Sequence, residues 1–392
     1  MKEKLKIAVV STPTLPVPPF RGYGGTQRGI YDFLTHMSEK GHRLHLFAPK
    51  DSDVSDLENV VLHGTLEMSL WVPENSAPID VKRSLARLHH EIAIKKIKHI
   101  SIKEGIDIIN MREDNVPVLR ELCDSFGKNK VVYSLHNIKS REKIDAIKEL
   151  GITCITHCRN HKKQYEELPN IVTILYGINV ESFPFSNKTL SESEETPRLP
   201  ILKRLKEEGR DYLVNIGGIG ENKGQKTCIK LAKETGNALI IAGTPQSRED
   251  NSKTIYFEKE VKPFIDGRQI NYYGNANEEE KKELLKNAVG FVFPSGFEDM
   301  RWEEPFGRAP VEALSCGTPV IAYRKGSMQE IIFDRFNGFL FDTFDEAVEK
   351  IKAIRNIDRK DCRRTAEKVF NSKRVADEYE KLFYKIIAGS KK

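Results

Sequence analysis

The sequence predicts an α/β protein of two Rossmann-like domains, each a doubly wound sheet, that face a central cleft. The 392 residues are too many for one typical hydrophobic core, so two domains are expected. Short apolar, β-branched runs alternate with longer amphipathic stretches almost throughout, which is typical of parallel sheets covered by helices. One segment, 186–200, is polar and poor in apolar residues, as linkers between domains often are.

Six strands are expected in each half of the chain. Those of the first half are residues 5–11, 44–48, 106–111, 131–136, 152–156 and 171–175. Those of the second half are residues 212–216, 238–242, 270–273, 290–294, 319–323 and 338–341. Helices are expected between most of them, for example at 27–40, 81–103, 225–235 and 278–286. Ligands of such sheets bind at the carboxyl ends of the strands, so the loops that follow strands are the candidate sites.

Composition is that of a soluble globular protein, with 39% apolar and 31% charged residues. No segment approaches the roughly 20 apolar residues that span a bilayer, and the first apolar run is too short for a secretory signal. Six scattered cysteines are typical of reduced thiols, so a cytoplasmic protein is expected. The net charge of +6 suits an anionic substrate, a nucleic acid or an anionic membrane, and selects none of them.

The stretch 293–332 contains two carboxylates at an informative spacing. Glu304 and Glu312 lie eight positions apart and flank the start of a predicted helix, which a Gly-Thr-Pro sequence ends. Backbone amides near Gly307 and Arg308 would be unpaired at that helix N-terminus and could donate to phosphate oxygens. Carboxylates suit sugar hydroxyls, because each can accept two hydrogen bonds. The charges alone fit equally well a solvated helix with no ligand.

This stretch resembles the E-x7-E motif of glycosyltransferase family 4, the retaining enzymes with the GT-B fold among the glycosyl transferases group 1. The resemblance covers nearly the whole chain and includes Ala-Leu-Ser-Cys-Gly-Thr-Pro-Val-Ile-Ala at 313–322, Gly326 with Glu330, and Asn-Gly-Phe at 337–339. It implies that Glu304 contacts hydroxyls of the donor sugar and that Glu312 contacts the nucleotide ribose. It also implies that the diphosphate is held by three amides, those of Phe306, Gly307 and Arg308.

A second loop, 215–224 (NIGGIGENKG), resembles the family's Gly-Arg-Leu-x-x-x-Lys-Gly phosphate loop. Lys223 matches the lysine that neutralises the donor diphosphate, whereas Gly218 stands where the family has arginine. A diphosphate leaving group that no metal assists normally requires more than one cation. Another arginine is therefore expected to compensate, and the candidates are Arg308, Arg301 and Arg21. The loop lacks the third glycine of a dinucleotide fingerprint, and a plain βα turn is the alternative.

In the first half, Gly24 and Gly25 follow the first strand and resemble the family's Gly-Gly loop, which faces the donor diphosphate. Gln27 replaces the usual glutamate. His136 ends a strand and matches a family histidine that lies near the transferred sugar, although a lone histidine is more often structural. By the resemblance, residues 1–185 form the acceptor-binding domain, 186–205 a linker, 206–372 the nucleotide-sugar domain, and 373–392 a terminal helix that returns to the first domain.

Three further patterns have plainer explanations. The D-x-D at Asp51 and Asp53, which resembles a metal motif, is expected to be a solvated turn. The basic stretch 81–103 is expected to be a solvated helix face, with an anionic membrane or an anionic acceptor as the alternative ligand. A set of four thiols and imidazoles lacks the spacing of a zinc ribbon and is expected to be structural: Cys154, His157, Cys158 and His161.

The function predicted is retaining transfer of a hexose from a nucleoside-diphosphate sugar, for which the resemblance favours UDP, to a hydroxyl of an acceptor. The acceptor is a saccharide, a lipid-linked sugar or a small molecule, and neither a metal nor another cofactor is expected. A catalytically altered sugar-nucleotide-binding protein and a GT-B epimerase or phosphorylase are the alternatives. A nucleic-acid partner is not expected, because no recognition motif appears. The acceptor is expected to be selected by loops of the first half, such as 57–78.

Overall fold

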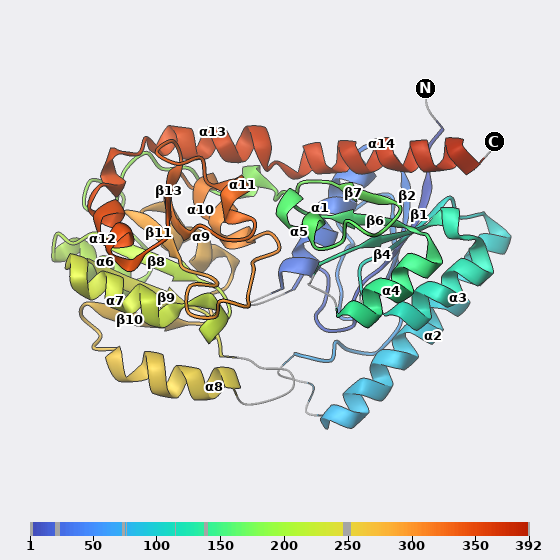
Figure 1. The fold of residues 1–392 in the computed structure, drawn as a ribbon, viewed down its shortest axis with the longest axis horizontal. Helices are drawn as coiled ribbons and strands as arrows, with labels where there is room; N and C mark the ends of the chain where they lie inside the picture. Colours follow the sequence, from blue (N-terminus) through green and yellow to red (C-terminus); the bar gives the residue numbers. More distant parts are fainter. Residues whose placement is uncertain are drawn as a thin grey trace. The chain divides into compact units, whose positions relative to one another are not determined.

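The computed structural model describes residues 3–19, 24–72, 75, 77–113, 115–136, 140–245 and 252–390 (Figure 1). They form two compact units. The N-terminal unit comprises the described residues up to Tyr176 and those from Ser372 onward, and the C-terminal unit comprises those of Gly177–Asn371. Each unit contains one parallel sheet with helices packed around it.

The sheet of the N-terminal unit has seven parallel strands in the order β3-β2-β1-β4-β5-β6-β7. They are β1 (Lys6–Val10), β2 (Arg43–Ala48), β3 (Val60–Gly64), β4 (Ile108–Met111), β5 (Val131–Ser134), β6 (Thr153–Thr156) and β7 (Ile171–Thr173). The helices are α1 (Gly25–Glu39), α2 (Ile79–Lys103), α3 (Val116–Phe126), α4 (Arg141–Leu150), α5 (Arg159–Lys163) and α14 (Ser372–Ser390). The strand order reverses between β1 and β4, where such sheets bind ligands.

The sheet of the C-terminal unit has six parallel strands in the order β10-β9-β8-β11-β12-β13. They are β8 (Tyr212–Ile216), β9 (Ala238–Ala242), β10 (Ile270–Gly274), β11 (Gly290–Phe293), β12 (Val320–Tyr323) and β13 (Gly338–Phe341). The helices are α6 (Pro200–Glu207), α7 (Gln225–Thr235), α8 (Ser252–Tyr256), α9 (Glu278–Lys286), α10 (Arg308–Ser315), α11 (Met328–Ile331), α12 (Phe344–Lys352) and α13 (Arg359–Val369). Here the order reverses between β8 and β11.

All twelve predicted strands are present, and α7 and α9 have the predicted bounds. Strand β3 was not predicted, and it lies within the segment 57–78 that was expected to form loops. Every residue of β3 is only partly buried, because the strand lies at the edge of its sheet beyond β2. It therefore lacks the continuous apolar character that marks buried parallel strands.

The expected linker, 186–205, belongs to the C-terminal unit. The amide of Ser186 donates to the carbonyl of Cys316 at 3.1 Å, and the Ser191 hydroxyl donates to Asp211 at 2.8 Å. Helix α6 covers its last residues, so the boundary between the units lies at 176/177 rather than at 185. The polar composition of this segment reflects side chains that are used in hydrogen bonds within the unit.

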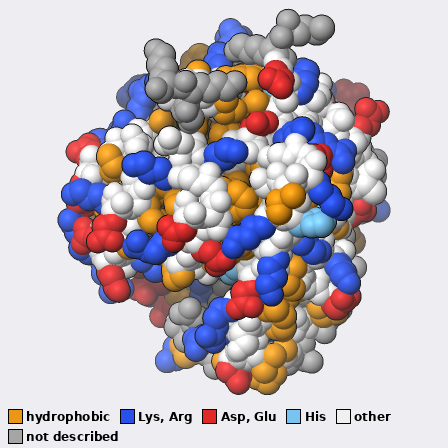
Figure 2. Space-filling view, turned by 90° about the vertical axis from the view of Figure 1, so that its right-hand side faces the viewer, with side chains coloured by type: hydrophobic (Ala, Val, Ile, Leu, Met, Phe, Trp, Pro, Cys, Tyr) orange, Lys and Arg blue, Asp and Glu red, His pale blue; other side chains and the backbone are white. Residues whose placement is uncertain are grey.

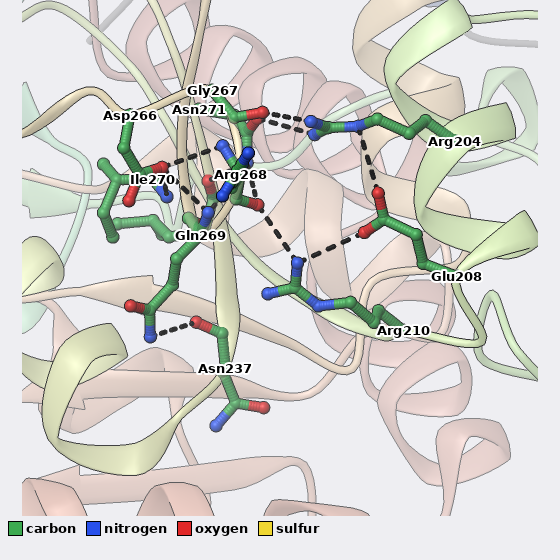
Figure 3. Close-up of polar contacts among 11 residues, drawn as sticks. Arg204, Glu208, Arg210, Asn237, Asp266, Gly267, Arg268, Gln269, Ile270 and Asn271 are labelled. Atoms are coloured by element: carbon green, nitrogen blue, oxygen red, sulfur yellow. Dashed lines mark hydrogen bonds and ion pairs between the residues drawn. The ribbon is translucent and has the colours of Figure 1, made fainter.

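A polar turn fixes the amino end of β10, the end of the sheet opposite the candidate loops (Figure 3). The Asp266 carboxylate accepts hydrogen bonds from three successive amides, those of Arg268, Gln269 and Ile270, at 2.8, 2.8 and 2.9 Å. Burial raises the pKa of Asp266, but these amides outweigh it, so the pKa lies below its ordinary value. Arg204 of α6 donates to Asn271 Oδ1 at 2.8 Å and joins the helix to the strand. The cluster therefore has a structural role.

Candidate active site

The loops that follow β8 and β11 meet where the strand order of the C-terminal unit reverses. Lys223, at the end of the first loop, forms an ion pair through Nζ with the carboxylate of Glu304 in the second. The two side chains are only 14% and 12% exposed. The fold thus brings together the predicted phosphate lysine and the predicted sugar-binding glutamate at the place where doubly wound sheets bind ligands.

Glycine conformation and one buried amide shape the Lys223 loop. Gly224 has a φ of 72°, and a β-carbon there would lie 2.9 Å from the Pro294 carbonyl oxygen, so the position requires glycine. The Gln225 side chain accepts from the Gly220 amide at 3.2 Å and donates to the Gly218 carbonyl at 3.1 Å. These bonds fold the loop back onto the start of α7, which places Lys223 beside the second loop.

Glu304 is held through both its side chain and its backbone. The Ser295 hydroxyl donates to the Glu304 carboxylate at 3.2 Å, and the Ser327 amide donates to the Glu304 carbonyl at 3.1 Å. Gly326 has a φ of 58°, and a β-carbon there would lie 2.8 Å from the Glu304 carbonyl oxygen. The Lys223 ammonium lies 5.0 Å from the centre of the Trp302 ring, within cation–π range. Glu304 therefore depends on a close backbone approach that only glycine permits.

Glu312 lies on α10, which begins after Gly307, a residue with a φ of 87°. Its carboxylate is nearly buried and lies 2.9 Å from Lys281 Nζ of α9 and 3.5 Å from Arg308 Nε. Phe306 is also buried, and its carbonyl accepts from the Ser327 hydroxyl at 2.5 Å. Lys281 was not predicted as a site residue, because nothing distinguishes it by sequence from the other charged residues of α9.

The structure distinguishes among the arginines that could replace the one absent at Gly218. Arg308 lies at the site but pairs with Glu312. Arg301 is 91% exposed and pairs with Asp299 at 3.2 Å. Arg21 lies outside the described residues. Arg308 is thus the one of these candidates that the structure places within the candidate site.

The two glycines predicted as site residues in the N-terminal unit lie at the start of α1, after the loop that follows β1. Gly24 precedes α1, and Gly25 is its first residue and accepts from the Tyr176 hydroxyl at 3.2 Å. Gln27 is buried, and its amide donates to the Thr12 and Thr14 hydroxyls, both at 2.8 Å. The residue that departs from the family pattern therefore fixes the loop that follows β1.

His136 follows β5, and its ring stacks on that of His157 with the centroids 4.6 Å apart. His157 lies at the carboxyl end of β6 and is buried. Burial lowers the pKa of His157 well below its ordinary value, and the nearby Arg112 and His161 act in the same direction. His136 thus packs against a neutral imidazole that the sequence analysis had assigned to a structural set.

The alternative metal motifs are used in hydrogen bonds. Asp51 accepts from the Ser69 amide and hydroxyl at 2.9 Å each, so both of its carboxylate oxygens bind a segment 18 positions away rather than its own turn. Within the described ranges, one group of side chains lies close enough together to hold a metal ion, and it consists of His89, His90 and Glu113. His89 already bonds the Thr65 hydroxyl and the Ser11 carbonyl, at 2.6 and 2.9 Å. In the Cys154–His161 set, the Cys158 sulfur accepts from the His161 amide at 3.2 Å at the start of α5, and the structural role of the set stays a prediction.

Comparison with known proteins finds similarity across the C-terminal unit. Residues 201–370 match the family model of the glycosyl transferases group 1. The chain is 23% identical over 368 residues to the putative glycosyltransferase YtcC of Bacillus subtilis, which covers 89% of this chain and 82% of that protein. The C-terminal unit is therefore similar to the domain of the group 1 glycosyltransferases, and the names of the relatives support a transferase.

Solved structures show the fold. Sucrose-phosphate synthase from Thermosynechococcus elongatus superposes with a TM-score of 0.76 at 17% identity, over 98% of this chain and all of that chain. Anabaena Alr3699/HepE in complex with UDP-glucose superposes with a TM-score of 0.69 at 16% identity, over 97% of this chain and all of that chain. The fold is thus the GT-B architecture of two Rossmann-like domains.

Proposed function

We propose that the chain transfers a hexose from a nucleoside-diphosphate sugar to a hydroxyl of an acceptor, with retention of configuration and without a metal. The Lys223–Glu304 ion pair at the switch point is the observation that carries this proposal. A nucleotide sugar joins a polyol to a diphosphate through one bond, so its site requires a hydrogen-bond acceptor directly beside a cation. The solved complex of Alr3699/HepE with UDP-glucose supports UDP as the nucleotide.

In this proposal Glu304 binds sugar hydroxyls and Lys223 binds the diphosphate. Phe306, Gly307 and Arg308, at the start of α10, offer amides to the phosphate oxygens, and Glu312 accepts from the ribose hydroxyls. The bond between the anomeric carbon and the phosphate oxygen breaks as the acceptor oxygen bonds to the same face of that carbon. The proton of the acceptor hydroxyl passes to the departing phosphate oxygen, so charges and atoms balance. Cationic side chains stabilise the leaving group, which is the role that a metal has in other transferases.

The acceptor is proposed to bind the N-terminal unit, where His136 and the loops after β1 and β4 lie at the carboxyl ends of the strands. Gly24 and Gly25 are proposed to approach the donor diphosphate through the backbone. His136 is proposed to contact the transferred sugar, with the His157 ring fixing its plane by stacking. The activity of the protein is thus expected to depend on the imidazole rings of both His136 and His157.

NMR of the product is the experiment that tests this proposal. The protein is incubated with UDP-glucose, and with other nucleotide sugars, in the presence of EDTA and a panel of hydroxyl acceptors. A transferase releases one nucleoside diphosphate per glycoside formed, and a retaining one keeps the anomeric configuration of the donor. Release of an altered sugar without acceptor would indicate the epimerase, a requirement for inorganic phosphate the phosphorylase, and binding without turnover the altered binding protein. A product of inverted configuration, or turnover that EDTA abolishes, would contradict the proposal.

We also propose that a lipid-linked acceptor is reached at an anionic membrane through the start of α2. The buried residues of α2 begin only at His89, and Ile79, Val81 and Leu88 are each about two-fifths exposed. Figure 2 shows a band of hydrophobic side chains with Lys and Arg beside it, low on this face, where α2 begins in Figure 1. Apolar residues flanked by basic ones are typical of helices that lie on anionic membranes. In the part of the chain that the structure describes, no helix is long and apolar enough to cross a bilayer.

Co-sedimentation with vesicles tests the membrane surface. Arg83→Glu with Arg87→Glu is expected to abolish binding to vesicles that contain phosphatidylglycerol. Arg120→Glu with Lys148→Glu, which reverses two exposed charges on α3 and α4, is expected to retain binding. Equal binding to vesicles of phosphatidylcholine alone, or no binding by the unaltered protein, would overturn this part of the proposal.

A further inference from the structure

We propose that Lys253 supplies the second cation for the donor diphosphate, at the place that Gly218 leaves without a charge. This inference rests on the proposed function. Loss of a diphosphate leaving group without a metal requires more positive charge than Lys223 alone provides. Arg308 lies 3.5 Å from the Glu312 carboxylate, and Arg301 is almost wholly exposed. Among the described candidates, the site therefore calls for a cation from another element.

Lys253 lies directly against the phosphate loop. It belongs to α8, which is remote in sequence from both site loops. A β-carbon placed on Gly220 would lie 3.4 Å from Lys253 Cγ and 3.6 Å from its Cε. The aliphatic part of the side chain thus runs along the backbone two residues after Gly218, and its terminal methylene, which carries the ammonium, is within van der Waals reach of the loop.

The space around Gly218 is open to such a side chain. No described atom lies within 4 Å of a β-carbon placed on Gly218. Gly218 follows β8 by two residues, at the carboxyl end of the strand where the order reverses. The loop therefore offers room for a cation at this point but no side chain of its own. A long, flexible lysine from a neighbouring helix can supply that charge.

A network of hydrogen bonds holds α8 beside the loop. The Tyr256 hydroxyl accepts from the Lys226 amide at 3.0 Å and donates to Glu298 at 3.1 Å. The same Glu298 carboxylate accepts from the Thr227 amide and hydroxyl at 2.7 and 2.6 Å. These bonds fix the end of α8 to the first turn of α7, the helix that the phosphate loop enters. Lys253 lies three residues before Tyr256. Its helix is therefore anchored to α7, the helix that begins directly after Lys223 and its loop.

The binding of UDP and of uridine distinguishes a phosphate contact by Lys253 from a merely structural role of that residue. A cation at the diphosphate contributes to the binding of UDP and not to that of uridine. Truncation of Lys253 should thus weaken the affinity for the charged ligand alone. A packing defect at α8 would weaken both ligands and lower the melting temperature.

Isothermal titration of the full chain with UDP and with uridine tests the assignment. Lys253→Ala is expected to raise the Kd for UDP about tenfold or more, to leave the Kd for uridine unchanged, and to lower kcat/KM for the nucleotide sugar. Lys259→Ala, which removes an exposed charge from the residues that follow α8, is the matched control and should bind UDP as the unaltered protein does. Gly218→Arg in the Lys253→Ala background should restore UDP binding, because the site has room for the longer side chain.

Unchanged affinity for UDP in Lys253→Ala, while the unaltered protein binds UDP and turns over, would overturn the inference and leave the proposed function standing. Equal weakening of UDP and uridine would also overturn it, because the effect would then be structural. Absence of nucleotide binding in the unaltered protein would instead overturn the proposed function itself. The outcomes therefore separate the two proposals.

Discussion

Lys223 and Glu304 are 81 positions apart in the chain, yet their side chains form an ion pair between the loops that follow β8 and β11. A switch point brings these two loops together, because the strands that precede them are neighbours although they are not consecutive. Opposite charges side by side match the two halves of a nucleotide sugar, one rich in hydroxyls and one anionic. The pair thus links the topology of the sheet to the proposed chemistry.

Glu304→Gln is expected to lower kcat/KM by about 100-fold or more, which is typical when a group that stabilises the transition state is removed. The amide retains the shape of the carboxylate but loses the charge that fixes it against Lys223 and strengthens its bonds to sugar hydroxyls. Affinity for UDP, which lacks the sugar, should fall by less than about threefold. The rate of UDP release measures the first effect, and calorimetric titration with UDP measures the second. Glu303→Gln, an adjacent change of the same kind, should leave both unchanged, and full activity of Glu304→Gln would contradict the assigned role.

Gly326→Ala is expected to cost more stability than the same substitution at a glycine with similar φ and open surroundings. Its β-carbon would lie 2.8 Å from the Glu304 carbonyl oxygen, in addition to the strain of a φ of 58°. Gly236→Ala carries the backbone strain alone, since its φ is 71° and no described atom lies within 4 Å of the added carbon. Strained backbone positions cost about 1–3 kcal/mol each, so Gly236→Ala should remain folded. Thermal unfolding and activity are compared; equal losses in the two variants would show that the close approach to Glu304 has no consequence.

Much of the candidate site is predictable from the sequence, because the signals for it are local. Buried strands, a glycine-ended helix and two glutamates at fixed spacing are visible within short windows of residues. The residues that local patterns do not reveal act across elements. Lys281 has the same sequence environment as its charged neighbours, and only the packing of α9 against α10 brings it to Glu312. Lys253 likewise lies on a short helix that no motif connects with the phosphate loop.

The boundary between the two units, at 176/177, precedes the expected linker for a similar reason. Composition treats the polar residues of 186–205 as solvated, whereas Asp211 and Cys316 give them partners far along the chain. Strand β3 was missed because an edge strand is only half buried, so that its pattern resembles that of a loop. Long-range hydrogen bonds and edge positions are set by the tertiary structure, and local patterns carry little information about them.

Gln225→Leu is expected to raise the KM for the donor about tenfold by releasing the phosphate loop. Leucine fills the buried space but leaves the Gly220 amide and the Gly218 carbonyl without this partner, which costs about 1–3 kcal/mol of stability. Gln269→Leu is the matched control, because Gln269 donates to the Ala232 and Asn237 carbonyls at the opposite end of the sheet. It should lose comparable stability with an unchanged KM. An unchanged KM in both variants would show that the loop does not depend on the Gln225 amide.

The N-terminal unit is expected to lose stability in mild acid before the C-terminal unit does. All ten histidines lie in the N-terminal unit. Burial lowers the pKa of His63 to about 4 and that of His89 to about 3, from an ordinary value of 6.5. The unfolded chain therefore binds more protons than the folded one in this window. The contribution of the neutral histidines to the free energy of unfolding is fully present above about pH 6.5. It is lost as the pH falls toward about 4.

The two tryptophans report on the two units separately. Trp302→Phe leaves Trp71 as a probe of the N-terminal unit, and Trp71→Phe leaves Trp302 as a probe of the C-terminal unit. Fluorescence melts between pH 7.5 and 5 should show a falling melting temperature with the Trp71 probe and a smaller change with the Trp302 probe. Equal shifts in both, or a rise with falling pH at Trp71, would contradict the assignment of the effect to the buried histidines.

A thermal shift experiment with nucleotides and nucleotide sugars, each with and without EDTA, tests the proposed donor site. A ligand that binds only the folded protein raises its melting temperature. We expect UDP and a UDP-sugar each to stabilise the protein as strongly with EDTA as without it. We expect this stabilisation to be lost in Lys223→Ala. If no nucleotide stabilises the protein, or if Lys223→Ala is stabilised as fully as the unaltered chain, the account of the Lys223–Glu304 pair as a donor site is wrong.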